Sequence, residues 1–303
     1  MSSKLIAKLQ EVKYIITNTD IDGIASAAIL KTAFPHLELG GFSNSRDKIW
    51  YVKDATKKNS CYLDIFMCGD DLFCIDNHII TPNSKHTVCK ETKFNPNIIR
   101  ERTLENYWSK YPFGTYFWIL FNLEKEGFNW DIDIEQKIGE HNGEDVFLWE
   151  LLLRADDALL STFKYAKNAN DWWDYLLTNN KNENSLLKRL YIKLMNDVKN
   201  QNNAQYIKDK VNSFLVSAFK NIKNDGYKNI TDEGFETFFN FLNELLGNTL
   251  QYRNDFQTYE FQYKILTVTP NTDLTVLESI HGKLASLAFV SRDKISVSIK
   301  VNS

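Results

Sequence analysis

The sequence predicts a mixed α/β protein with a mainly parallel sheet in its N-terminal lobe. In the first half, short apolar runs alternate with helix-like stretches, whereas the pattern turns helical from about residue 113 and strand-like again after residue 258. A chain of 303 residues is long enough for two or three packed units. We therefore expect an α/β lobe over residues 1–165, a helical connector over residues 166–258 and a small α/β lobe over residues 259–303.

Four apolar runs in the first half are typical of strands that are covered on both faces. They are residues 12–17, 37–42, 60–66 and 72–76. The alanine-rich segment 24–33 lies between the first two runs, and we expect it to be a helix that ends before Pro35, because a residue that precedes proline disfavours the helical conformation. This order favours parallel strands that are connected by helices.

The rest of the chain predicts helices first and a small α/β segment last. Apolar residues at helical spacing continue through the middle of the chain, with short polar interruptions, and a strict alternation near the end indicates a half-buried strand. The predicted elements are helices over 117–126, 146–163 and much of 164–260, a strand over 259–266, a helix over 274–287 and a strand over 294–301.

Composition and charge argue against two classes of partner, long duplex nucleic acid and membranes. Thirty-six basic and 39 acidic residues give a net charge of −3, which argues against a basic surface that binds long duplex nucleic acid. No apolar run reaches the ~18 residues of a membrane span, and residues 1–14 lack a secretory signal. The cysteines (Cys61, Cys68, Cys74 and Cys89) form no CxxC pair. We therefore expect a cytoplasmic protein with reduced cysteines and no membrane partner.

Aspartates follow three of the predicted strands at their C-terminal ends. Asp20 and Asp22 follow the first strand, and Asp64 and Asp76 end two others. The carboxyl ends of parallel strands line one edge of a sheet, where ligands bind. Carboxylates at one edge repel each other unless a cation lies among them, and oxygen-rich sites select Mn²⁺ or Mg²⁺. Two such ions can activate a water and clamp a phosphoryl group.

Two segments are candidates for phosphate contacts. Gly23 lies at the start of the first predicted helix, where unpaired N–H groups and the positive end of the dipole suit a phosphate. Arg46 and Lys48 follow the second predicted strand and can donate to phosphate oxygens. The alternatives are a helix cap at Asp20–Gly23 and a polar surface loop around Arg46.

Five short motifs occur in the order of the DHH phosphoesterase superfamily, which the first 165 residues resemble. They are residues 18–27 (NTDIDGIASA), 63–64 (LD), 75–78 (IDNH), 114–116 (GTY) and 154–158 (RADDA). The likeness is greatest to members that degrade very short RNA and linear or cyclic dinucleotides. Residues 294–300 (KISVSIK) resemble the start of that family's small substrate-binding domain.

The resemblance implies a DHH-type lobe that holds two Mn²⁺ or Mg²⁺ ions and hydrolyses a phosphodiester in a short nucleotide, as a phosphodiesterase or oligoribonuclease does. By motif, Asp20, Asp22, Asp64 and Asp76 are metal-site residues, and His78 contacts the scissile phosphate beside Asp76. The last ligand is Asp156 or Asp157. Gly114 and Thr115, with Gly23, are expected on the substrate side.

The choice between Asp156 and Asp157 depends on helical spacing. Leu152 and Leu160 flank Asp156 at i±4, so we expect Asp156 to be buried and to need a cation there. Asp157 lies near Arg154, where a solvated carboxylate is stable. This favours Asp156 and leaves Asp157 open.

Three departures from the family pattern define an alternative function. Asn18 and Asn77 stand where the family has histidines, and an asparagine oxygen ligates a hard cation more weakly than imidazole does. The family's glycine-rich segment is not found in residues 259–303. The alternative is therefore a catalytically degenerate protein of this fold that binds a nucleotide or a partner. A third interpretation is hydrolysis of a phosphoanhydride such as pyrophosphate. Whether the protein forms a homodimer stays open.

Overall fold

The computed structural model describes residues 2–86, 88–223 and 225–301. The chain forms two compact units, each assembled from segments that are distant in sequence. We call them the sheet unit (Lys4–Asn18, Phe34–Tyr111 and Arg253–Ser303) and the helical unit (Met1–Ser3, Thr19–Ala33 and Pro112–Tyr252).

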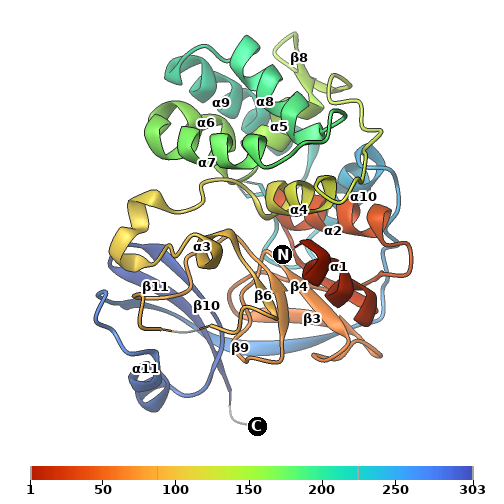
Figure 1. Cartoon of the computed structure of the whole chain (residues 1–303). Helices are drawn as coiled ribbons and strands as arrows, with labels where there is room; N and C mark the ends of the chain where they lie inside the picture. Colours follow the sequence, from red (N-terminus) through yellow and green to blue (C-terminus); the bar gives the residue numbers. More distant parts are fainter. Residues whose placement is uncertain (1, 87, 224, 302–303) are drawn as a thin grey trace. The chain divides into compact units, whose positions relative to one another are not determined.

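The sheet unit is built on one sheet of nine strands among the described residues, in the order β10-β11-β9-β3-β2-β1-β4-β5-β6 (Figure 1). Neighbouring strands from β2 to β6 in this order are parallel, and the pairings from β10 to β2 are antiparallel. The strands are β1 (Tyr14–Asn18), β2 (Glu38–Ser43), β3 (Lys48–Val52), β4 (Ser60–Leu63), β5 (Phe73–Ile75), β6 (Lys93–Phe94), β9 (Phe256–Thr267), β10 (Leu284–Ser291) and β11 (Lys294–Lys300).

The parallel strands lie in the core because their sequences are apolar on both faces. All residues of β1, β4 and β5 are buried. In contrast, β9 is largely exposed or half-buried along its length, as expected for a strand with polar side chains on one face. Helices α1 (Ser2–Glu11), α3 (Pro96–Ile99) and α11 (Leu274–His281) and the 3₁₀ helix η1 (Leu104–Ser109) accompany the sheet.

The helical unit is organised around α2, which is apolar on nearly its whole circumference and is therefore buried. It packs against α4 and α10, and its small residues Ala25 and Ala28 permit close approach. The elements are α2 (Ile21–Ala33), α4 (Thr115–Glu124), β7 (Lys137–His141), β8 (Glu144–Phe147), α5 (Leu148–Arg154), η2 (Ala155–Asp157), α6 (Ala158–Lys164), α7 (Ala166–Thr178), α8 (Leu186–Asp197), α9 (Gln201–Ala218) and α10 (Phe235–Leu245).

The mixed α/β class is confirmed, and two predicted helices are wrong in part. The predicted helix over 146–163 is interrupted at Asp156 and Asp157, which both have a positive φ. The predicted helix over 274–287 ends at His281, and residues from Leu284 onward form β10 because they pair with β11. Apolar runs alone do not separate a short helix from a buried strand.

The two compact units interleave along the chain, whereas the segments 1–165, 166–258 and 259–303 are consecutive. As a statement about domains, that division stays a prediction. Within the described ranges, none of the helices has the length and apolar character needed to cross a membrane.

Candidate functional site

The predicted site residues fall into two groups, one in each unit. The sheet unit holds Asn18, Asp64, Asp76, Asn77 and His78, and the helical unit holds the remaining aspartates. We name the first group the β4–β5 cluster and the second the α2–α4 cluster.

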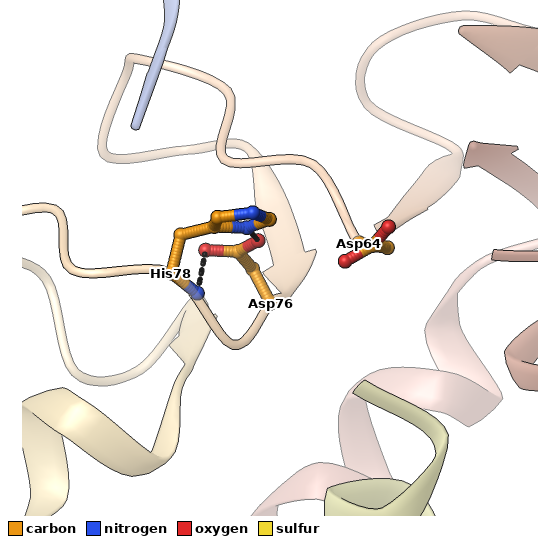
Figure 2. Close-up of side chains that lie close together, drawn as sticks. All are labelled: Asp64, Asp76 and His78. Carbon is orange, nitrogen blue, oxygen red and sulfur yellow. Dashed lines mark hydrogen bonds and ion pairs between the residues drawn. The ribbon is translucent and has the colours of Figure 1, made fainter. Parts of the chain in front are cut away.

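The β4–β5 cluster lies at the carboxyl ends of two adjacent parallel strands. Asp64 follows β4 and Asp76 follows β5, and the last residues of these strands, Leu63 and Ile75, are in register. One ligand atom from each of Asp64, Asp76 and His78 lies within 4.8 Å of the others (Figure 2). Asp64 is 3% exposed and Asp76 is 1% exposed. Two buried carboxylates beside an imidazole are a set of groups that could hold a metal ion.

Asp76 holds His78 in a defined orientation. The Asp76 Oδ1 atom is 2.8 Å from His78 Nδ1, and Oδ2 accepts the His78 backbone N–H at 3.1 Å (Figure 2). A carboxylate at Nδ1 fixes the tautomer and the ring plane, so that His78 acts through Nε2. The side chain of His78 is 37% exposed, in contrast to Asp76, so a ligand can reach the imidazole.

Two asparagines that the sequence analysis missed support this turn. Asn95 donates from Nδ2 to Asp76 Oδ2 at 3.1 Å and to the His78 carbonyl at 2.8 Å. Its Oδ1 accepts the Asn97 N–H at 2.8 Å, and Asn97 donates from Nδ2 to the Asn77 carbonyl at 2.6 Å. Asn95 is the N-cap of α3, directly before a proline, and that sequence pattern was a visible signal of a helix start.

Asn18, at the end of β1, contacts Asp64. Its Nδ2 donates to Asp64 Oδ2 at 3.1 Å, and Asp64 adopts a left-handed backbone with a φ of 58°. The Asp64 N–H donates to the Ile75 carbonyl, which fixes this residue beside β5. A non-glycine residue in this conformation is uncommon and marks a position that its surroundings hold in place.

In the α2–α4 cluster, Asp22 accepts hydrogen bonds from the first turn of α4. Its Oδ2 accepts the Thr115 N–H at 2.7 Å, and its Oδ1 accepts the Tyr116 N–H at 3.0 Å. A Cβ atom at Gly114 would lie 2.7 Å from Asp22 Oδ1, so this approach requires glycine. A carboxylate at a helix N-terminus is also favoured by the helix dipole.

Three of the predicted substrate-binding residues therefore donate hydrogen bonds to the carboxylates of Asp20 and Asp22 or permit their close approach. The Thr115 N–H donates to Asp22, the Gly23 N–H donates to Asp20 Oδ1 at 2.9 Å, and Gly114 permits the approach of Asp22. Their role in binding substrate stays a prediction.

Like charges gather around Asp22. Asp22 is 2% exposed, and one of its carboxylate oxygens lies within 4.8 Å of one of Asp156. Burial raises the pKa of Asp22 well above its ordinary value, the charges of Asp156 and Asp20 raise it further, and the N–H groups of Thr115 and Tyr116 oppose the shift. A cation here would remove the repulsion.

Asp156, rather than Asp157, lies next to Asp22, but the expected burial of Asp156 is wrong. Asp156 is exposed, because the backbone leaves the helical path at η2 and the i±4 neighbours of a regular helix do not apply. Asp157 forms an ion pair with Lys208 at 2.7 Å. Sequence analysis also missed the ion pair between Arg154 and Asp225, at 2.9 Å, which joins the η2 turn to a distant segment of the helical unit.

Arg46 and Lys48 belong to the sheet unit and have partners of their own. The Arg46 guanidinium lies 6.0 Å from the centre of the Tyr263 ring, and the Lys48 ammonium is 3.8 Å from Glu260. An exposed ion pair of this length contributes little stability. The predicted contacts of both residues with phosphate stay predictions.

Comparisons of the chain with protein-family models, curated proteins and solved structures each give no match. The resemblance to the DHH phosphoesterases therefore depends on the motifs alone. What the structure adds is that these motifs place carboxylates and an imidazole within metal-binding distance.

Replacing Asp156 by asparagine is expected to stabilise the metal-free protein at pH 7, by less than about 1 kcal/mol in the free energy of unfolding, because a like charge beside Asp22 is removed. The raised pKa means that the folded chain binds the Asp22 proton more tightly than the unfolded chain does. At about pH 4, which lies below this raised pKa, Asp22 is protonated in the folded chain, so the repulsion and the gain are both absent. Urea unfolding at both pH values measures the difference.

The matched control is Asp157→Asn, which removes the adjacent charge but breaks the ion pair with Lys208. We expect it to give no stabilisation at pH 7. Equal stabilisation by both variants would contradict the placement of Asp156 beside Asp22.

Proposed function

We propose that the chain is a metal-dependent phosphodiesterase that hydrolyses short oligonucleotides or linear or cyclic dinucleotides. The observation that carries the proposal is the β4–β5 cluster, where Asp64, Asp76 and His78 converge at the carboxyl ends of parallel strands. Ligands of open α/β sheets bind at this edge. The same residues belong to the motifs that resemble the DHH phosphoesterases.

The donor set fits a hard divalent cation. Carboxylate oxygens suit both Mn²⁺ and Mg²⁺. In the proposal, Asp64 and Asp76 are metal ligands of the β4–β5 cluster, Asp20, Asp22 and Asp156 are metal ligands of the α2–α4 cluster, and Asn18 and Asn77 stand at the positions of family ligands. When bound, such ions lower the pKa of a water and neutralise charge on a phosphoryl group.

Asp76, Asn95 and His78 have separate roles in the proposed reaction. Asp76 orients His78, and Asn95 holds the turn that carries both. His78 then either stabilises charge that grows on the phosphoryl oxygens or gives a proton to the leaving oxygen. Its partial exposure suits a group that contacts substrate directly.

A second candidate is a degenerate protein that binds a nucleotide or a partner without hydrolysis. Its support is the orientation of Asn18, whose Nδ2 donates to Asp64. A neutral amide that donates to a carboxylate occupies an oxygen that a metal would otherwise take. The two candidates differ in metal uptake, which is measurable.

The deciding experiment uses the full chain, stripped with EDTA and then supplied with Mn²⁺. The substrates are a linear and a cyclic diadenylate, and chromatography follows the release of product, which is mononucleotide from the linear substrate and linear diadenylate from the cyclic one. We expect Mn²⁺-dependent release from at least one of them. Mn²⁺ uptake without release, or nucleotide binding without Mn²⁺ uptake, would favour the binding protein and overturn the enzyme.

A further inference from the structure

A pocket in the sheet unit lies outside the β4–β5 cluster. It has a volume of about 340 Å³ and is bounded by the segment after β4, the segment that leads into β6, helix α11 and strand β10. Its apolar wall consists of Phe66, Ile80, Val88, Leu274, Leu284 and Leu287. This volume is at the lower end of the range of ligand sites, so the pocket suits a small molecule and not a dinucleotide.

Lys93, on β6, contributes a buried positive charge to the lining. Lys93 is 3% exposed, and its ammonium donates to the carbonyls of Met67, at 3.0 Å, and of Leu72. The third hydrogen bond is to the Cys74 sulfur at 3.5 Å, which is a weak acceptor, and the ammonium also lies 5.2 Å from the centre of the Phe66 ring. In the described part of the chain no carboxylate lies within 4 Å of this ammonium. A buried ammonium without a counter-charge is costly and favours an anion nearby.

The other charged groups of the lining lie nearer solvent. Asp70 and Lys283 are exposed and Glu278 is half-buried. The Glu278 Oε1 atom accepts the Leu284 N–H at 3.1 Å, which ties this carboxylate to the backbone. Among the described ionisable side chains of the lining, Asp70, Glu278 and Lys283 lie at the rim, Cys68 and His86 are half-buried, and Lys93 is buried.

We propose that this pocket binds a small monocarboxylate with an apolar body, whose carboxylate interacts with Lys93 while the body fills the space between α11 and β10. The apolar wall favours a ligand with an apolar body, and the Lys93 ammonium, which has no counter-charge among the described residues, favours a carboxylate on that ligand. Cys68 also lines the pocket, and burial raises the pKa of its thiol to about 12, so the ligand is held without a thiolate. The site is separate from the proposed hydrolysis and does not depend on it.

Three probes of one shape test the charge. Titration calorimetry in EDTA compares 4-phenylbutyrate, 4-phenylbutan-1-ol and 4-phenylbutylamine on the full chain. We expect the carboxylate to bind about tenfold more tightly than the alcohol, and the amine to bind most weakly, because the Lys93 ammonium attracts a negative charge and repels a positive one. Equal affinities, or no binding of the carboxylate, would overturn the proposal.

Three variants locate the ligand. Leu287→Trp fills the pocket and should abolish binding, whereas Val276→Trp, at an exposed position on α11, should leave the affinity unchanged. Lys93→Met should keep the affinity for the alcohol and remove the preference for the carboxylate. If Lys93→Met does not fold, the comparison of Leu287→Trp with Val276→Trp still tests whether the carboxylate binds in this pocket. Unchanged affinity for the carboxylate in Leu287→Trp would overturn the site. Because no metal or hydrolysis enters these measurements, their outcome is independent of the proposed enzyme.

Discussion

Replacing Asp64 by alanine is expected to lower Mn²⁺-dependent hydrolysis of a dinucleotide by about 10³-fold. Asp64 is buried at the end of β4, within 4.8 Å of the ligand atoms of Asp76 and His78. A catalytic metal stabilises charge in the transition state by several kcal/mol. Each 1.36 kcal/mol corresponds to a factor of ten in rate, so the loss of a ligand that holds the ion is expected to lower the rate about a thousandfold. Initial rates at saturating Mn²⁺ measure the effect.

The control for Asp64→Ala is Asp54→Ala, which removes an exposed carboxylate of the same unit. Asp54→Ala should retain the full rate and the increase in melting temperature that Mn²⁺ gives to the original chain. Asp64→Ala should lose both. A normal rate in Asp64→Ala, with the fold intact by circular dichroism, would rule out the role of the β4–β5 cluster in the reaction.

The strands that position this cluster were predictable because their signal is local. Residues 60–66 and 72–76 are apolar runs that each contain an aspartate near the end of the strand, and parallel pairing brings those ends together. Asp64 and Asp76 were therefore expected to lie close to each other. The order of apolar runs and helix-like stretches in the first half also predicted the parallel strands β2, β1, β4 and β5.

The parts that could not be predicted depend on contacts between distant residues. Asn95 joins the site by hydrogen bonds to Asp76 and His78, and nothing in its own neighbourhood specifies those partners. The left-handed backbone at Asp156 ends a helix that the apolar periodicity would continue. Likewise, β10 is a strand because β11 pairs with it, although the same residues fit a helical pattern. Local patterns identify apolar faces, whereas the partners across a turn or a sheet are set by the tertiary fold.

Replacing His78 by glutamine is expected to lower the hydrolysis of a dinucleotide by about 10²-fold or more, with a smaller change in KM. Proton transfer by a positioned side chain contributes about 10²–10⁴-fold, and glutamine can donate a hydrogen bond but cannot transfer a proton. Asp76 binds Nδ1, so the transfer would involve Nε2. Steady-state rates over a range of substrate concentrations measure both parameters. The control is His141→Gln in the helical unit, which should leave both unchanged.

The identity of the leaving group separates the two roles of His78. Bis(4-nitrophenyl) phosphate releases nitrophenolate, which leaves without a proton, whereas a nucleoside alkoxide needs one. If His78 protonates the leaving oxygen, His78→Gln should hydrolyse the nitrophenyl ester within about tenfold of the original rate while it remains slow on the dinucleotide. If His78 stabilises the phosphoryl oxygens, the loss should be similar for both substrates. No loss on either substrate would remove His78 from the reaction and leave Asp76 and Asn95 as residues that hold a turn of the sheet unit.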